Sequence, residues 1–150
     1  MRNCVRSVSP DAIVHLGDYY EDGQVLAEEN PNIVVHQVPG NCDANRCSPD
    51  LPRILCYPVC GVWLYMTHGH LHHVKYGTAA LLRDAKEKKV QAVLYGHTHS
   101  PECYQDEDGM WVMNPGTCGT SGGSAGIIET ENGSIVNCRL IRQEDLEDFI

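Results

Sequence analysis

The stretch Val93-Leu94-Tyr95-Gly96-His97-Thr98-His99 is the most informative part of the sequence, because an apolar run ends in two histidines one residue apart. On a turn that leaves a strand, the imidazoles of His97 and His99 can converge on one point. Imidazole nitrogens suit borderline transition metals. The stretch therefore predicts a strand that carries a metal site at its end.

Three further fragments bring potential ligands to the ends of other apolar runs. They are Gly17-Asp18, Gly40-Asn41-Cys42-Asp43 and Thr67-His68-Gly69-His70. Because α/β folds place their sites on loops at the carboxyl edge of the sheet, these side chains are expected to meet there. One carboxylate, one amide oxygen and three imidazoles suit Mn, Fe, Ni or Zn, with Mn favoured. These candidate ligands are Asp18, Asn41, His68, His97 and His99.

The hydrophobic pattern predicts an α/β sandwich with a mixed sheet. Strand, helix and strand alternate in the first half of the chain, and hairpins dominate the second. Helices are expected over 22–29 and 78–89, with Ala79, Leu82 and Ala85 on the apolar face of the second. Segment 143–150 is compatible with a short helix or a frayed tail. Strands are expected at 12–16, 33–36, 53–56, 62–66, 90–95, 111–113, 125–128 and 135–141.

Length and composition indicate one globular domain over residues 1–150. The net charge of −9 argues against nonspecific nucleic-acid binding, which needs a basic face. No apolar run approaches the roughly 18 residues that cross a bilayer, and no apolar stretch of a secretory signal follows the N-terminus. A cytoplasmic location is therefore expected.

Eight cysteines are present, but none forms a C-x-x-C pair. Together with the missing secretory signal, this favours reduced thiols over a disulfide framework. A structural zinc site built from cysteines is a weaker alternative, because Cys56-x-x-x-Cys60 has no second pair at matching spacing.

Some other conspicuous residues are given structural roles. His72 is expected in a solvated loop, and Trp63 and Trp111 in the core. Segment 119–126 is rich in Gly and Ser but lacks the lysine pattern of a phosphate-binding loop, so it is expected to be a flexible connection.

The motifs resemble those of the calcineurin-like metallophosphoesterases, in the order that this family has. The closer match is the small bacterial and archaeal phosphodiesterase branch, to which the retromer subunit Vps29 is also similar. The resemblance extends from about Asp11 to Ile141 and implies an αββα sandwich with mixed sheets, lacking the first strand and part of the first helix. The motifs are Leu16-Gly17-Asp18, Gly40-Asn41-Cys42-Asp43, Thr67-His68-Gly69-His70, Gly96-His97-Thr98-His99 and Asn114-Pro115-Gly116-Thr117.

The resemblance implies a role for each motif residue. Asp18 would bridge two metals, and His99 would bind the first of them. The second metal would be completed by Asn41, His68 and His97.

Two more motif residues are implicated in catalysis by the resemblance. His70 would lie near the substrate phosphate. Cys42 stands where many relatives carry a catalytic histidine that protonates the leaving group. This replacement is typical of the phosphodiesterase branch and argues against phosphomonoesterase activity.

The family's first motif, an Asp-x-His at the end of the first strand, is absent. Residues 2–9 resemble the tail of the family's first helix, so the chain is expected to begin after that strand. The first metal would then keep only Asp18 and His99, which favours one bound metal here in place of the family's two. A truncated gene model or fragment is favoured over a genuine remnant with impaired catalysis.

Two functions are compatible with the resemblance. The first is a metal-dependent phosphoesterase that hydrolyses small phosphodiesters with a hydroxide activated by two metals, in an intact or an impaired form. The second is a noncatalytic, metal-stabilised protein-interaction module like Vps29. A small phosphodiester is the expected partner of the first, and a homo-oligomer is left open. Nucleic acid and membrane partners are not expected.

Overall fold

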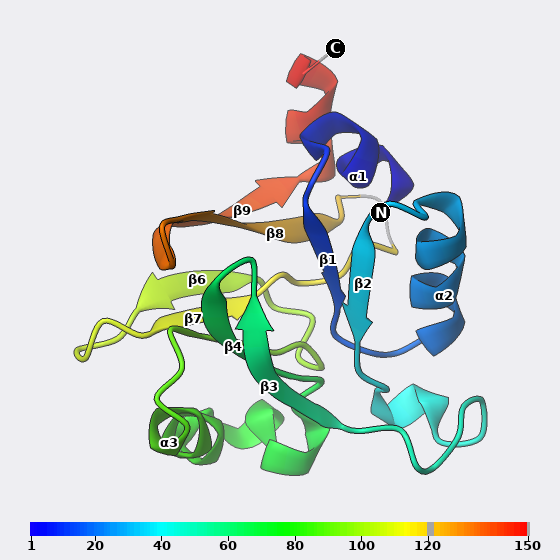
Figure 1. Ribbon diagram of the computed structural model, residues 1–150. Coiled ribbons are helices and arrows are strands. Elements are labelled where there is room, and N and C mark those ends of the chain that lie inside the picture. Colours follow the sequence, from blue (N-terminus) through cyan, green and yellow to red (C-terminus); the bar gives the residue numbers. More distant parts are fainter. Residues whose placement is uncertain (120–121, 150) are drawn as a thin grey trace.

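The computed structural model describes residues 1–119 and 122–149 and has helices on the outer sides of packed β-sheets (Figure 1). The helices are α1 (Arg2–Val8), α2 (Tyr20–Glu29) and α3 (Ala79–Glu87), with 3₁₀ helices η1 (Asn41–Asp43), η2 (His70–His72), η3 (Val74–Tyr76) and η4 (Gln143–Phe149). The strands are β1 (Ala12–His15), β2 (Val34–Gln37), β3 (Ile54–Val59), β4 (Val62–Thr67), β5 (Ala92–Leu94), β6 (Glu102–Gln105), β7 (Trp111–Asn114), β8 (Ser124–Glu131) and β9 (Ser134–Arg142).

The strands form three sheets. The largest has the order β3-β4-β5-β7-β6, in which β4, β5 and β7 are parallel and the two edge strands are antiparallel to their neighbours. Strands β1 and β2 form a parallel pair, and β8 and β9 form an antiparallel hairpin. Helix α2 connects β1 to β2, and α3 connects β4 to β5, because parallel neighbours need a crossover.

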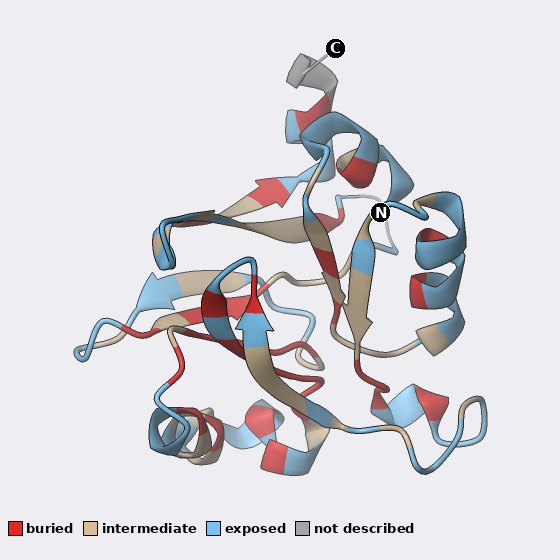
Figure 2. Cartoon of the chain, in the orientation of Figure 1, coloured by how far each residue is buried: buried red, intermediate tan, exposed pale blue. Residues whose placement is uncertain are grey.

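Apolar side chains define the layers. One cluster lies between the five-stranded sheet and the two smaller sheets; its buried members include Leu64, Met66, Leu94 and Met113, and Val14 of β1 packs against it. A second cluster covers the other face of the large sheet with α3, and a third joins α1 and α2 to β1. The exposed sides of α1 and α2 face away from the strands (Figure 2). This arrangement confirms the expected α/β sandwich of the αββα type.

The predicted strands are all present, but the sequence pattern missed β6. Its sequence Glu102-Cys103-Tyr104-Gln105 contains no apolar run, and among the described strands β6 lies at the edge of its sheet, next to β7. Segment 143–149 is a 3₁₀ helix, which decides between the two alternatives for that part of the tail, whereas residue 150 lies outside the described residues. Residues 120 and 121 of the expected loop 119–126 also lie outside them, and β8 begins at Ser124.

Helix α3 is confirmed, and its predicted inner face was right for Ala85 and in part for Leu82, but it included Ala79 and missed Leu81. Leu81 and Ala85 are fully buried, whereas Ala79 is exposed and Leu82 is only partly buried. Leu81 and Ala85 are four residues apart, so they lie on one side of the helix. The few apolar residues of this helix fit two faces, and packing against Tyr65 and Val93 selects the one with Leu81.

Two further predictions are corrected. Trp63 is 48% exposed and belongs to none of the hydrophobic clusters, because it lies next to the β3–β4 turn. His72 is buried, since η2 folds back and places its Nε2 3.2 Å from the Tyr65 hydroxyl and 3.0 Å from Asp84 Oδ2. Trp111 is partly buried against the central cluster, as expected.

The eight cysteines lie within the described residues, and each is a free thiol. No helix in the described part of the chain has the length and apolar character needed to span a bilayer.

The orientation of α3 can be tested by mutation. Leu81→Ala should lower the free energy of unfolding by about 2–5 kcal/mol, because it removes a fully buried side chain and leaves a cavity. Leu82→Ala on the same helix is the matched control and should cost clearly less. Urea denaturation followed by circular dichroism measures both, and equal losses would contradict the assigned face.

Candidate metal centre

The loops that follow β1, β2, β4 and β5 meet at one edge of the structure. The Cys42 amide donates to Asp18 Oδ1 at 3.0 Å, which joins the loops after β1 and β2. His68, which follows β4, accepts at its carbonyl from the Gly96 amide at 3.0 Å, and its Nδ1 lies 2.7 Å from the Leu16 carbonyl oxygen. The four predicted motifs therefore converge at the carboxyl ends of these strands.

His68 has one ring nitrogen fixed by the backbone. A carbonyl oxygen can only accept, so Nδ1 must carry the proton in its contact with Leu16. In the neutral ring, Nε2 is then an acceptor. It lies 3.0 Å from Asn41 Oδ1 and 3.5 Å from Asp18 Oδ2.

Three electron-rich atoms therefore face one another at His68, Asn41 and Asp18. They repel unless an electropositive group lies between them: the Asn41 amide nitrogen after rotation of that amide, a proton on Nε2, or a metal cation. A histidine whose other nitrogen donates to a backbone carbonyl is the usual arrangement of a metal ligand. The residues therefore fit a divalent cation at this point.

Two more imidazoles lie beside His68. The ring centroid of His97 is 5.0 Å from that of His68, and the ring of His70 is 5.3 Å from His68 and 6.1 Å from His97. Burial, followed by the nearby charges of other histidines, lowers the pKa of both His70 and His97. The rings consequently stay neutral at physiological pH, which is the form that binds metals.

The five predicted ligands are brought together to different extents. Asp18, Asn41 and His68 are in direct contact, and His97 lies next to them. His99 is exposed, and its charge contributes to the lowered pKa of His97, after burial and other nearby charges. Within the described residues, no three His, Cys, Asp or Glu side chains are arranged around one point as a ready metal site. Metal ligation by all five residues thus stays a prediction.

The two further catalytic candidates are at the centre. His70 is partly buried, and its Nδ1 has no hydrogen-bond partner among the described residues. The Cys42 thiol is exposed, 3.7 Å from the Asn41 amide nitrogen. The charge of Asp18, with smaller contributions from burial and from Asp43, raises the pKa of Cys42. Cys42 therefore remains a protonated thiol, which is the state required of a proton donor.

The backbone at the centre is held in uncommon conformations. Asp18, Tyr19, His97 and His99 have φ values of 59°, 58°, 67° and 59°. Such residues cost about 1–3 kcal/mol each and cluster at functional sites, where the surrounding structure imposes them.

Two glycines allow the loops to approach. A Cβ on Gly17, whose φ is +97°, would lie 2.7 Å from the Gly40 nitrogen and 2.8 Å from His68 Nδ1. A Cβ on Gly40 would collide with the Asp18 carboxylate. No other residue type allows these loops to pack so closely.

Asp43 is a structural residue of the site whose role the sequence did not reveal. Its carboxylate is fully buried and accepts from the Gly40 amide at 2.7 Å and from the Tyr20 amide at 3.0 Å. It therefore ties the Asn41 loop to the first turn of α2. The sequence showed Asp43 as part of the Gly40-Asn41-Cys42-Asp43 motif. It did not show the contact with Tyr20, which is distant in sequence.

Asn114 supports the loop that carries His97 and His99. Its side chain is fully buried and donates to the Gly96 carbonyl at 3.2 Å and to Thr98 Oγ1 at 2.8 Å, while its Oδ1 accepts from the Gly116 amide at 3.0 Å. The motif Asn114-Pro115-Gly116-Thr117 predicted a turn here. In the structure, the Asn114 side chain of this turn holds the loop from Gly96 to His99.

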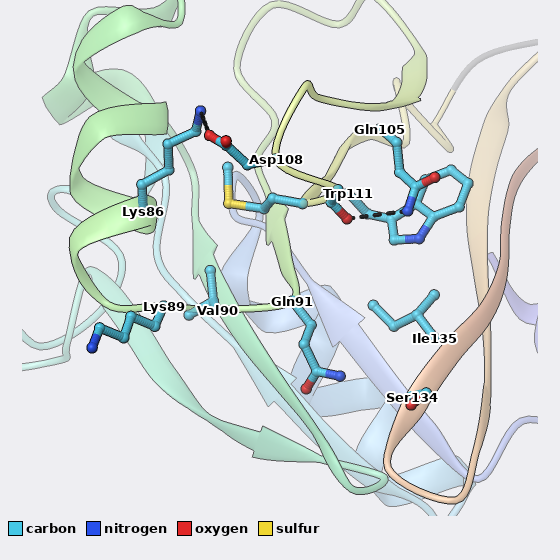
Figure 3. A pocket seen from close by; sticks show the side chains of 11 residues that line it. Lys86, Lys89, Val90, Gln91, Gln105, Asp108, Trp111, Ser134 and Ile135 are labelled. Carbon is cyan, nitrogen blue, oxygen red and sulfur yellow. Dashed lines mark hydrogen bonds and ion pairs between the residues drawn. The ribbon is translucent and has the colours of Figure 1, made fainter.

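A hollow of about 520 Å³ lies at the other end of the large sheet, before β5 begins (Figure 3). Its polar side chains are mostly paired with neighbours: Lys86 contacts Asp106 and Asp108, and Gln91 and Gln105 bond to backbone groups. It holds none of the candidate ligands. We therefore place the chemistry at the carboxyl edge, despite the size of this hollow.

Asn114→Ala should lower the free energy of unfolding by about 1–3 kcal/mol, because the Gly116 amide loses its acceptor and Thr98 Oγ1 loses a donor, while the Gly96 carbonyl still accepts from the Thr98 amide at 2.8 Å. Asn45→Ala, at an exposed turn position, is the matched control and should change stability little. Urea denaturation measures both values. Equal stability of the two variants would show that Asn114 does not support the His97 loop.

Solved structures with this fold match most of the chain. An archaeal phosphodiesterase is 22% identical over 93% of this chain and 87% of its own, with a TM-score of 0.65. Vps29 from Entamoeba histolytica, in complex with Zn²⁺, is 17% identical over 88% of this chain and 82% of its own, with a TM-score of 0.66. A Thermotoga maritima protein solved by NMR is 27% identical over 93% and 85%, with a TM-score of 0.63. Among curated proteins, no relative matches the sequence.

The family comparison covers most of the chain. The sequence model described as the calcineurin-like phosphoesterase superfamily domain matches residues 2–133, which contain all five candidate ligands and Asn114. This match confirms the resemblance carried by the ordered motifs, and the family is metal-dependent. The chain therefore belongs to the calcineurin-like phosphoesterase superfamily.

Proposed function

We propose that the chain binds a divalent cation, with Mn²⁺ favoured, and hydrolyses small phosphodiesters. The observation that carries this proposal is the group of three acceptor atoms at His68 Nε2, Asn41 Oδ1 and Asp18 Oδ2. Membership of the phosphoesterase superfamily supports the reaction class.

Asp18, Asn41, His68 and His97 would hold one cation, and Asp18 and His99 would be the protein ligands of a second. When bound, such a cation neutralises charge on the phosphate oxygens and lowers the pKa of water. The chain itself supplies orientation: the Leu16 carbonyl fixes the His68 ring, and Asp43 fixes the Asn41 loop.

Two side chains would act on the substrate directly. His70, whose buried Nδ1 has no hydrogen-bond partner in the part of the chain that the structure describes, would orient the phosphate group. Cys42, kept protonated by the charge of Asp18, would donate its proton to the departing alcohol. A thiol in this position supports diesters as the substrate class.

A noncatalytic interaction module is the second candidate. It is favoured by one observation, that within the described residues no three His, Cys, Asp or Glu side chains form a ready metal site. In that case a single cation at His68 would only hold the loops together, and no turnover would be seen.

The first proposal predicts that the protein hydrolyses bis-p-nitrophenyl phosphate in the presence of Mn²⁺. His68→Ala should reduce the rate about 100-fold, because it removes the acceptor atom that the other two face. Asp50→Ala, at an exposed position outside the site, is the control and should keep the wild-type rate.

The release of p-nitrophenol measures the rates, and circular dichroism verifies that each variant is folded. An inert wild-type protein that still binds Mn²⁺ would favour the interaction module. Equal rates of the wild-type protein and His68→Ala would contradict both the site and the activity.

A further inference from the structure

A second hollow, of about 580 Å³, lies beside the candidate metal centre. Its wall includes Thr98, which is placed between His97 and His99 in the sequence, and Tyr95, which ends the preceding apolar run. The hollow therefore shares the Gly96–His99 loop with the centre. Its lining residues are Val74, Lys75, Gly77, Thr78, Tyr95, Thr98, Ser100 and Glu102.

The hollow offers groups that can form additional hydrogen bonds. Thr98 Oγ1 accepts from Asn114 at 2.8 Å and from the Ser100 amide at 3.3 Å, so its own hydroxyl proton is available to donate. Glu102 accepts from the Tyr95 hydroxyl through one carboxylate oxygen, which leaves the other oxygen as an acceptor. The hydroxyls of Thr78 and Ser100 add to this polar lining.

Lys75 supplies a positive charge at the same place. Among the described residues it forms no ion pair, unlike Lys86, which bridges two carboxylates. Lys75 lines the hollow together with Thr98, the residue between His97 and His99 in the sequence, so it lies near the loop that carries these imidazoles. In a chain with a net charge of −9, a lysine beside the centre that forms no ion pair with the described residues provides local attraction for an anion.

The geometry points to a substrate-specificity site in this hollow, and the inference rests on the proposed function. Lys75 binds the anionic phosphodiester group at the rim, and Glu102 and Thr98 bind hydroxyl groups of one of its two alcohols. The substrate class is therefore a phosphodiester of a hydroxylated alcohol, such as a sugar or a polyol. In the reaction, water forms a new P–O bond, the P–O bond to one alcohol breaks, and that alcohol leaves with a proton.

The carboxylate at Glu102 distinguishes this class from apolar alcohols. Hydroxyl groups donate well to a carboxylate, whereas an aromatic alcohol would leave the free oxygen of Glu102 buried without a partner. A site that is built to bind hydroxyl groups therefore discriminates against an analogue that lacks them.

Binding of ribose 5-phosphate and of phenyl phosphate tests the inference without relying on turnover. Both probes carry the same phosphate group, but only the first has hydroxyls. Isothermal titration calorimetry with Mn²⁺ present should give tighter binding of ribose 5-phosphate. Lys75→Ala should weaken the binding of both probes about tenfold, and Lys75→Arg should restore most of it.

Glu102→Gln should reduce the preference for ribose 5-phosphate over phenyl phosphate about tenfold. Lys88→Ala and Glu107→Gln, which change exposed residues outside the hollow, are the matched controls and should bind both probes as the wild type does. Lys75 is exposed, so its replacement is not expected to disturb folding.

The inference is overturned if the wild-type protein binds neither probe, if it shows no preference between them, or if Lys75→Ala binds as tightly as the wild type. The phosphodiesterase assay is a separate readout. Binding through Lys75 and Glu102 without hydrolysis would contradict the proposed activity and support the ligand class. Hydrolysis without the predicted binding differences would support the proposed activity and contradict the ligand class.

Discussion

The hydrogen bond from His68 Nδ1 to the Leu16 carbonyl is the constraint on which the site depends. It joins the end of β4 in the large sheet to the end of β1 in the opposite layer, at 2.7 Å. Because it fixes the proton on Nδ1, it directs the lone pair of Nε2 toward Asn41 and Asp18. The packing of the two layers thereby creates a place that suits a positive charge.

Other interactions keep that place in shape. The buried carboxylate of Asp43 holds the Asn41 loop, and the buried amide of Asn114 holds the His97 loop. Gly17 and Gly40 remove the side chains that would separate the loops. The left-handed conformations of Asp18 and His97 are strained, and these hydrogen bonds offset that cost.

Much of the fold could be predicted from the sequence, because eight of its strands are apolar runs of the expected length. Strand β6 could not, since its residues are polar and only its pairing with β7 makes it a strand. The inner face of α3 is set by packing against β4 and β5. The few apolar residues of this helix do not indicate by themselves which face is buried. His72 lies near the metal motif in sequence, but its burial comes from a turn that folds back on Tyr65.

The candidate site was predictable at the level of motifs. Asp18, Asn41 and His68 are in contact, as their positions after strands suggested. The Leu16 carbonyl was not predictable, because a backbone atom carries no signal in the sequence. The partners of Asp43 and the hollow beside Thr98 likewise depend on segments that are remote in sequence.

The central proposal is that a divalent cation binds at the position faced by His68 Nε2. ¹⁵N NMR of the histidine rings tests it most directly, during titration of the metal-free protein with Zn²⁺. On metal binding, the Nε2 resonance of His68 should shift while Nδ1 keeps its proton. A His68 ring whose Nε2 signal is unaffected by saturating Zn²⁺ would contradict it.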